Sequence, residues 1–308
     1  MTRLAALVLF ASSLVACGSN DGAPPADAPA PVEGKTSQEG GAPGFDAGKV
    51  VDSGAPAPSG AAFSVLTYNV AGLPEGLSSS KPATNTKLIS PRLNAFDLVM
   101  VQEDFAYHAD LASLATHAYR STPKGASGAD LGDGVNVFSA LRYTQTARVK
   151  WNDCNGIVDD KNDCLTSKGF LVGALELAPG VVVDVYDMHA DAGRASGDAK
   201  ARTKQVAQLV AEIAARSAGK AVLVAGDTNM KTEDEPAVLA LLSGAGLTDA
   251  CRAVACPEPG RIDRVMFRGS ADFALIAKSW AVETTFVDAK GDPLSDHEPV
   301  RVGMEWRR

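Results

Sequence analysis

The chain has 308 residues, of which 45% are hydrophobic and 21% are charged, and its formal net charge is −8. No Lys/Arg-rich run interrupts this acidic balance, which argues against a protein that binds nucleic acid tightly and nonspecifically through a basic face. The length and the hydrophobic share together predict a globular protein with a substantial core.

Residues 1–16 are predicted to be a lipoprotein signal peptide. Arg3 supplies a positive start, and residues 4–14 form an apolar stretch that is too short to span a bilayer. Residues 14–17 (Leu-Val-Ala-Cys) resemble a bacterial lipobox, which implies that Cys17 becomes the lipidated first residue after cleavage. Gly18 is similar to the pattern of lipoproteins in the outer membrane, so we expect attachment to the bacterial cell envelope there or at the cell surface. An ordinary signal peptide with an incidental cysteine is the alternative.

Residues 17–62 are predicted to be a disordered tether. They consist mainly of Ala, Pro, Gly, Asp and Ser and contain almost no large apolar residues. Such a segment cannot bury enough surface to offset the entropy lost on ordering. The remaining residues, 63–308, are long enough for one large catalytic domain.

Strands and helices alternate along this domain. Strands are predicted at residues 63–70, 98–101, 135–138, 170–177, 181–188, 221–225, 261–267, 278–287 and 299–306. Helices are predicted at residues 87–96, with an early interruption at Pro91, at 107–118 and 235–244, and from residue 196 or 198 to beyond residue 213. The second of these helices would place His108 and His117 on the surface. Mixed strand order with helices outside predicts an α/β fold, a four-layer sandwich of two packed mixed β-sheets flanked by helices.

Polar residues follow two of the predicted apolar strands. Residues 226–229 (Gly-Asp-Thr-Asn) come directly after the buried run at 221–225, and residues 295–297 (Ser-Asp-His) precede the last strand. Carboxylates can hold a hard divalent ion, an amide can orient a phosphate or a water, and an imidazole can move a proton. The two segments therefore predict a metal-assisted hydrolase, although Asp227 and Asn229 could also form a helix-capping turn.

Six short motifs occur in one order along residues 63–308. They are residues 68–70 (Tyr-Asn-Val), 101–103 (Val-Gln-Glu), 188–189 (Met-His), 226–229 (Gly-Asp-Thr-Asn), 262–263 (Ile-Asp) and 295–297 (Ser-Asp-His). In this order the chain resembles the endonuclease/exonuclease/phosphatase superfamily of the DNase I type. The resemblance implies a phosphodiesterase that hydrolyses a P–O bond with the help of a metal ion.

The resemblance also implies a metal site. Glu103 corresponds to the principal Mg²⁺ ligand of the family, Asn69 lies beside it, and Asp296 adjoins the site and assists. A hard cation suits few carboxylates together with water and substrate oxygens. We expect Mg²⁺, with Mn²⁺ or Ca²⁺ as alternatives.

Catalytic roles follow from the same resemblance. His297 corresponds to the general base that deprotonates the attacking water, and Asp263 corresponds to the carboxylate that orients it. His189 corresponds to the second histidine, which donates to the phosphate. Asp227 is implied to steer the nucleophile or the leaving group, and Asn229 to bind a nonbridging phosphate oxygen.

Four cysteines remain when Cys17 is set aside. An even number in an exported protein favours disulfides over free thiols. Among the three possible connectivities the sequence favours pairing of near neighbours, Cys154 with Cys164 and Cys251 with Cys256. A zinc site is disfavoured because the spacings are irregular and no histidine adjoins these cysteines.

The substrate is predicted from weaker signals. Residues 168–170 (Lys-Gly-Phe) are similar to a segment of bacterial neutral sphingomyelinases, which implies that Lys168 contacts the substrate, although Lys168 could also be a solvated charge at a strand start. We expect a phospholipid such as sphingomyelin and a monomeric enzyme. An extracellular nuclease that cleaves DNA and a noncatalytic binding module are the alternatives. Trp151 is the best candidate for an exposed aromatic at a loop tip, with a core role as the alternative.

Overall fold

The computed structural model describes residues 60–78, 80–125, 127, 130–156, 164 and 166–308. The predicted signal peptide, Cys17 and nearly all of the predicted tether lie outside the described residues. The first strand begins at Gly60, three residues before the predicted start of the domain. None of the helices in the described part of the chain combines the length and the hydropathy that a membrane span requires.

The first sheet contains six strands in the order β11-β12-β1-β2-β4-β3. Its strands are β1 (Gly60–Asn69), β2 (Leu98–Gln102), β3 (Tyr119–Arg120), β4 (Asn136–Ser139), β11 (Ala274–Val282) and β12 (Val300–Arg307). Only β1 and β2 are parallel neighbours, and their register places Asn69 beside Gln102. Residues that end or follow these two strands therefore share one edge of the sheet.

The second sheet repeats this arrangement in the order β5-β6-β7-β8-β10-β9. Its strands are β5 (Arg142–Lys150), β6 (Gly169–Ala178), β7 (Val181–His189), β8 (Ala221–Asp227), β9 (Thr248–Asp249) and β10 (Asp263–Arg268). The parallel pair here is β7 and β8, which aligns His189 with Asp227, while antiparallel β10 aligns Asp263 with Asp227. Three polar residues are thereby brought side by side at one end of the sheet.

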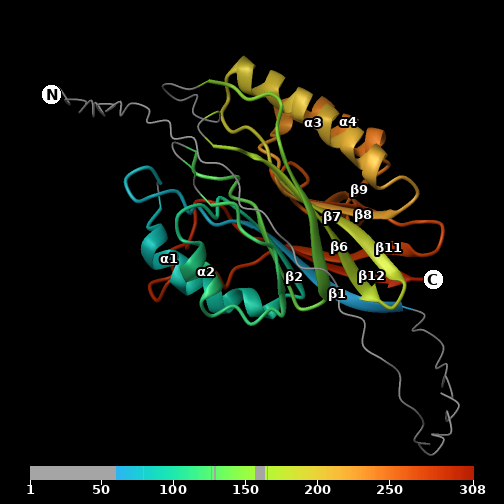
Figure 1. Ribbon diagram of the computed structural model, residues 1–308, viewed down its shortest axis with the longest axis horizontal. Helices are drawn as coiled ribbons and strands as arrows, with labels where there is room; N and C mark the ends of the chain where they lie inside the picture. Colours follow the sequence, from blue (N-terminus) through green and yellow to red (C-terminus); the bar gives the residue numbers. More distant parts are fainter. Residues whose placement is uncertain (1–59, 79, 126, 128–129, 157–163, 165) are drawn as a thin grey trace, which may run out of the picture. The chain divides into compact units, whose positions relative to one another are not determined.

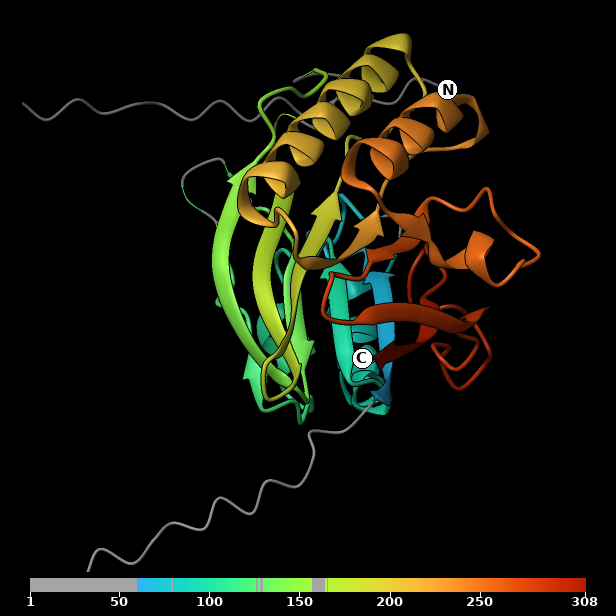
Figure 2. The ribbon, with the colours of Figure 1, turned by 90° about the vertical axis from the view of Figure 1, so that its right-hand side faces the viewer.

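The two sheets pack face to face, and helices cover their outer faces (Figures 1 and 2). The helices are α1 (Pro82–Ile89), α2 (His108–Ala112), α3 (Ser196–Arg216), α4 (Glu235–Ala245), α5 (Ala250–Ala253) and the 3₁₀ turns η1 (Ser90–Ala95) and η3 (Thr232–Asp234). Side chains of β8 alternate between two cores, because Leu223 packs between the sheets and Val224 packs under α3 and α4. A third core lies between the first sheet and α1 and α2. These layers confirm the predicted four-layer α/β sandwich.

Strand β5 was not predicted, and its sequence explains why. It carries arginine, threonine, glutamine and lysine over nine residues, and only Tyr143 is buried. The strand lies at the edge of its sheet and pairs only with β6, so it needs no continuous apolar run. The two-residue strands β3 and β9 are too short to leave a periodic signal.

The predicted helix at residues 107–118 is wrong beyond Ala112. Helix α2 has five residues, and the chain then turns so that Nε2 of His117 lies 2.9 Å from the carbonyl oxygen of Phe96. His117 is buried, and the prediction that it lies on the surface is therefore wrong. The predicted helix at residues 87–96 is also divided, because α1 ends at Ile89 and η1, which contains Pro91, follows it.

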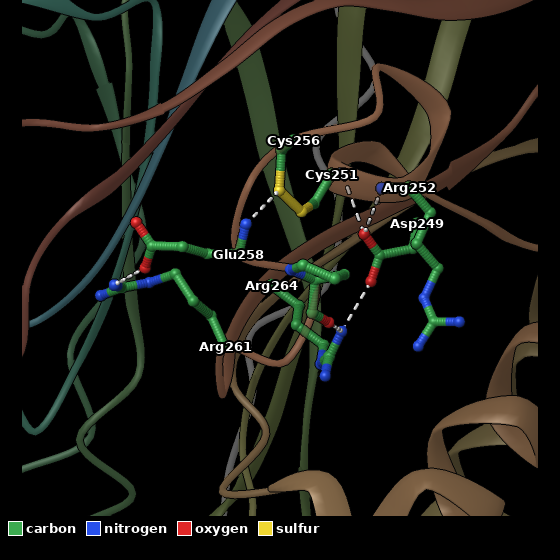
Figure 3. The surroundings of a disulfide bond; sticks show 8 residues. Asp249, Cys251, Arg252, Cys256, Glu258, Arg261 and Arg264 are labelled. Atoms are coloured by element: carbon green, nitrogen blue, oxygen red, sulfur yellow. Dashed lines mark hydrogen bonds and ion pairs between the residues drawn. A yellow bond between two sulfur atoms is a disulfide. The ribbon is translucent and has the colours of Figure 1, made fainter.

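Both cysteine pairs favoured by the sequence are joined in the structure. The Cα atoms of Cys154 and Cys164 lie 5.4 Å apart, and those of Cys251 and Cys256 lie 4.9 Å apart. Figure 3 shows the second pair, where Oδ1 of Asp249 accepts hydrogen bonds from the backbone N–H groups at the start of α5. The Asp249 carboxylate also accepts a bond of 2.8 Å from the buried guanidinium of Arg264. The short disulfide loop is thus fixed to β10, the strand that carries Asp263.

Trp151 is a core residue, not a loop-tip aromatic. Its side chain is 4% exposed and packs on Phe170, with the ring centroids 5.0 Å apart. Its indole N–H donates a hydrogen bond of 2.7 Å to the backbone carbonyl of His189. The residue therefore supports the strand end at which His189 lies.

Candidate active site

Polar side chains from both sheets meet where the parallel strand pairs end. Asn69 is the last residue of β1, and its Nδ2 lies 3.1 Å from Oε1 of Glu103 and 3.1 Å from Oδ2 of Asp227. The same nitrogen lies 3.5 Å from Nε2 of His297. Asn69 thus sits at the centre of a cluster contributed by segments that are far apart in the sequence. The structure brings together Asn69, Glu103, His189, Asp227, Asp263 and His297, six of the predicted site residues.

His297 and Asp263 form a hydrogen-bonded pair. Nδ1 of His297 lies 3.1 Å from both carboxylate oxygens of Asp263, and Nε2 lies 3.6 Å from Oδ2 of Asp227. Burial lowers the pKa of His297, but the hydrogen bond to Asp263 and the charges of Asp263, Asp227 and Asp296 outweigh it and raise the pKa to about 10. The pairing holds the proton on Nδ1 and leaves Nε2 directed at the centre of the site.

His189 has the opposite environment. Its ring is fully buried, and neither ring nitrogen has a hydrogen-bond partner among the described residues. Nε2 lies 3.5 Å from Oδ2 of Asp227 and 3.9 Å from Oε1 of Glu103. Burial, together with the positive charges of Lys168 and His297, lowers the pKa of His189 well below its usual value. The ring is therefore neutral and can donate one N–H to a ligand.

Unusual backbone conformations shape the strand ends. Gly226 has a φ of 142°, and a Cβ atom there would lie 1.9 Å from the carbonyl oxygen of Met188, so only glycine fits between β7 and β8. Glu103 and Asn229 adopt left-handed conformations with φ values of 56° and 50°. Such conformations are costly for residues other than glycine and cluster at functional sites. The amide of Asn229 donates to the backbone carbonyl of Ala190 at 3.2 Å, which keeps Asn229 at the margin of the cluster.

The chemistry of the donor set fits a hard divalent cation. Burial raises the pKa of Glu103 and that of Asp227, because each carboxylate lies among other acidic groups with little solvent to stabilise its charge. A cation between them would offset this cost through the oxygen ligands that Mg²⁺ and Ca²⁺ prefer. Asn69 presents its nitrogen to Glu103 while its oxygen accepts a 3.0 Å bond from the N–H of Ala71, so ligation by Asn69 requires its amide to turn.

A second group of possible ligands partly differs from the predicted set. Donor atoms of Asp227, Asp263 and His297 lie within 4.8 Å of one another. Asp227 and the His297 ring adjoin Asn69, which places this group next to Glu103. This trio is a second candidate ligand set, and it shares Asp227 with the first.

Lys168 and Asp296 border the cluster. Lys168 is 8% exposed, and its charge opposes the effect of burial on the pKa of Glu103. Asp296 is exposed and lines a cavity of about 300 Å³ together with Lys81, Asn85 and Asp288. A second hollow of about 270 Å³ is lined by Asp263, Asp296 and His297. The His297–Asp263 pair is therefore open to a ligand from this hollow.

A buried polar layer beneath the site was not predicted. Nε2 of Gln102 donates a 2.7 Å hydrogen bond to Oδ1 of Asp187 and a 3.2 Å bond to the hydroxyl of Thr67. This contact joins β2 of the first sheet to β7 of the second. Burial raises the pKa of Asp187 well above its usual value, which favours the neutral form of this side chain. The sequence offers one signal for this layer, a polar residue (Asp187) two positions before the strand-end residue His189, and such a pattern does not by itself predict a buried contact.

The chain is similar to proteins of known name in sequence and in fold. Residues 66–297 match the model of the Endonuclease/Exonuclease/phosphatase family. A protein of Mycobacterium tuberculosis named sphingomyelinase is 34% identical over 267 residues, which cover 79% of this chain and 53% of that protein. The chain thus spans about half the length of this relative.

Two solved structures illustrate the likeness of fold. Sphingomyelinase C from Streptomyces griseocarneus has a TM-score of 0.56 at 23% identity, with 79% of this chain and 99% of that chain covered. A double mutant of beta toxin from Staphylococcus aureus, solved with bound magnesium ions, has a TM-score of 0.59 at 17% identity and the same coverage.

Proposed function

Since the chain belongs to the endonuclease/exonuclease/phosphatase family, we propose that it is a metal-dependent phosphodiesterase acting on a phospholipid such as sphingomyelin. The observation that carries the hydrolase proposal is the convergence of two histidines and three carboxylates on Asn69. The preference for sphingomyelin rests on the relative of that name and on the absence of a Lys/Arg-rich run in the sequence.

Glu103, with Asn69 and Asp227 beside it, would hold the cation, for which we propose Mg²⁺, with Mn²⁺ or Ca²⁺ as alternatives. When bound, a divalent ion neutralises charge on the phosphate oxygens and favours departure of the leaving oxygen. Asp296 lies at the rim of the site and adds negative charge next to His297. The magnesium bound to the beta toxin structure supports this choice of ion.

His297 would act as the general base. Asp263 fixes Nδ1 at 3.1 Å, so Nε2 is free to accept a proton from water as the water oxygen attacks phosphorus. One P–O bond forms and the bond to the leaving oxygen breaks. The proton on Nε2 is then available for return to solvent or to the leaving group. Because the carboxylates around His297 raise its pKa to about 10, positive charge nearby is needed before the ring can serve as a base at neutral pH.

His189 and Asn229 would bind the phosphate. The neutral, buried His189 ring has an N–H with no partner among the described residues, and a phosphate oxygen would supply one. Lys168 adds positive charge on the same side of the site. Asp227 lies between the two histidines, within 3.6 Å of each, where it can steer the water or the leaving group.

Export and anchoring remain part of the proposal. The lipobox-like residues 14–17 support a mature protein that begins at a lipidated Cys17 and is attached to the cell envelope. Intact-mass measurement of the protein purified from its native membrane tests this, since cleavage and diacylation at Cys17 change the mass in a defined way. An N-terminus other than Cys17 would contradict it.

The test of the activity is cleavage by the purified full chain of sphingomyelin vesicles and of duplex DNA in parallel, with EDTA as a control. We expect Mg²⁺-dependent release of phosphocholine from the vesicles, and we expect H297A to abolish it. Lys290→Ala is a suitable control because Lys290 lies on an exposed turn. Cleavage of DNA alone would favour the nuclease, and inactivity toward both substrates would contradict the proposed function.

A further inference from the structure

We propose that Asp191 and Gln205 are positioning residues that hold His189 in the orientation in which it meets the phosphate. The proposal rests on the function proposed above. Asp191 lies two residues after His189, and Gln205 lies on α3. Their hydrogen bonds to each other lie directly behind the strand end that carries His189, so we expect their effect on the site to pass through that strand end.

The need for such a device follows from the His189 ring itself. His297 is oriented by the Asp263 carboxylate, whereas both ring nitrogens of His189 lack a hydrogen-bond partner among the described residues. The orientation of the His189 ring must therefore come from packing and from its backbone. Trp151 holds the carbonyl of His189 at 2.7 Å, and the carbonyl of Asp227 accepts from the N–H of Ala190 at 3.0 Å.

Asp191 completes this support from the far side. Its carboxylate is fully buried, and it accepts hydrogen bonds of 2.7 Å from Nε2 of Gln205 and 2.7 Å from the N–H of Asn155. The bond from the Asp191 N–H to Oε1 of Gln205, at 3.0 Å, makes the contact with Gln205 reciprocal. A buried carboxylate is costly unless it is fully bonded, so the chain keeps it at a cost that an apolar residue would avoid.

Helix α3 fixes the loop that follows His189 through the side chain of Arg202. Arg202, one turn before Gln205, is 2% exposed and donates to the carbonyl oxygens of Asp191 and Gly193, each at 3.1 Å. Its other terminal nitrogen donates to Asp234 at 2.8 Å. Since α3 spans 21 residues and packs along the second sheet, it gives the loop after His189 a rigid backing.

Exchanging the amide and the carboxylate between Gln205 and Asp191 distinguishes a positioning role from a general loss of structure. Gln205→Glu sets two carboxylates against each other across a bond of 2.7 Å, and we expect kcat to fall roughly 10- to 100-fold with KM little changed. Adding Asp191→Asn restores a donor opposite an acceptor while the Asn155 N–H keeps its acceptor. The 2.9 Å bond from Gln205 to the backbone carbonyl of Asp153 stays lost, so the double variant should recover part of kcat. Gln208→Glu, the same change one turn later on α3 at a half-buried position, is the matched control.

The second readout does not depend on turnover. The chain has four histidines, so ¹⁵N-labelled histidine gives a small, assignable set of ring signals. Gln205→Glu should shift the His189 ring signals and leave those of His117 in place, and the double variant should return them. Unchanged His189 signals and unchanged kcat in a folded Gln205→Glu variant would overturn the proposal.

Folding and function are kept apart in this design. If Gln205→Glu does not fold, Asp191→Asn alone is measured, because its amide opposes one of two donors without adding charge, and it should shift the His189 signals and lower kcat to a smaller extent. If the wild-type chain hydrolyses no phosphodiester, the proposed function fails, while the His189 signals still decide whether the pair positions the ring.

Discussion

The two histidines of the site are held by opposite means. His297 follows a loop, is partly exposed and is oriented by a carboxylate that raises its pKa to about 10. His189 ends a central strand, is fully buried and has a pKa that burial lowers well below its usual value. The same side chain is therefore suited to carry a proton on one side of Asn69 and to donate a hydrogen bond from a neutral ring on the other. Environment alone assigns these roles, since the residue type is identical.

The His297 side should be the more sensitive to a single change. We expect Asp263→Asn to lower kcat by roughly 10²–10⁴-fold, because the base loses the partner that fixes its tautomer. The loss of negative charge also lowers the pKa of His297, so the rising limb of the pH–rate profile should move to lower pH. Steady-state rates between pH 5 and 10 measure both effects. A profile that keeps its position would mean that Asp263 does not set the His297 pKa.

A substitution of His189 should lower kcat less than a substitution of Asp263. We expect His189→Gln to lower kcat by roughly 10²–10³-fold, because one donor to the transition-state charge is weakened while the base remains. The position of the rising limb should not change, since His189 is neutral throughout the range. A shift of the limb equal to that of Asp263→Asn would remove the distinction between the two histidines.

Each histidine has its own disulfide nearby, which extends the comparison. Asn155, next to Cys154, bonds to Asp191 behind His189. Glu258, next to the loop of Cys251 and Cys256, binds Arg261 at 2.7 Å, and Arg261 also binds Glu298, the neighbour of His297, at 2.9 Å. Replacing either pair by serine should cost about 2–3 kcal/mol in the free energy of unfolding, measured by urea denaturation.

The two serine replacements should lower the stability by similar amounts but should disturb different histidines. Loss of the Cys154–Cys164 bridge should change the His189 ring signals, and loss of the Cys251–Cys256 bridge should change those of His297. Identical spectral changes in both variants would show that the bridges act only through overall stability.

The smallest expected effect is on the pH dependence of stability, where the two histidines have opposite signs. The raised pKa of His297 gives stability that is present below pH 6.5 and is lost as pH rises toward about 10. The lowered pKa of His189 costs stability as pH falls below 6.5, because the unfolded chain then binds a proton that the folded chain does not. The urea midpoint, plotted against pH from 5 to 10, should vary less at high pH in His297→Gln and less at low pH in His189→Gln. Flattening at the same end would contradict the assignment.

The sequence predicts the layers of the fold better than its edges. Apolar runs such as residues 221–225 identify strands that are covered on both faces, and these agree with the structure. The edge strand β5 is not predicted, because it pairs with one neighbouring strand and buries one tyrosine, and therefore has no continuous apolar run. His117 was misplaced because a short helix ends before it and turns its ring inward.

For the site, the sequence predicts six residues that the structure brings together, but it does not predict how they are held. The motifs place Asn69, Glu103 and His297 in the family pattern, and register then explains why they meet. The sequence does not predict the contact between Asp191 and Gln205, because this contact joins a strand end to a helix face. The opposite pKa shifts of the two histidines likewise depend on burial, which spacing does not reveal.

The pairing of β1 with β12 has a practical consequence. Gly60 lies opposite Arg307, so the chain enters and leaves this sandwich at the same end of the sheet. The ten residues of β1 rise roughly 3.3 Å each, which puts Asn69 about 30 Å from that end. A fluorophore, a solid support or a carrier protein attached beside Gly60 or Arg307 would therefore leave the cluster around Asn69 unobstructed.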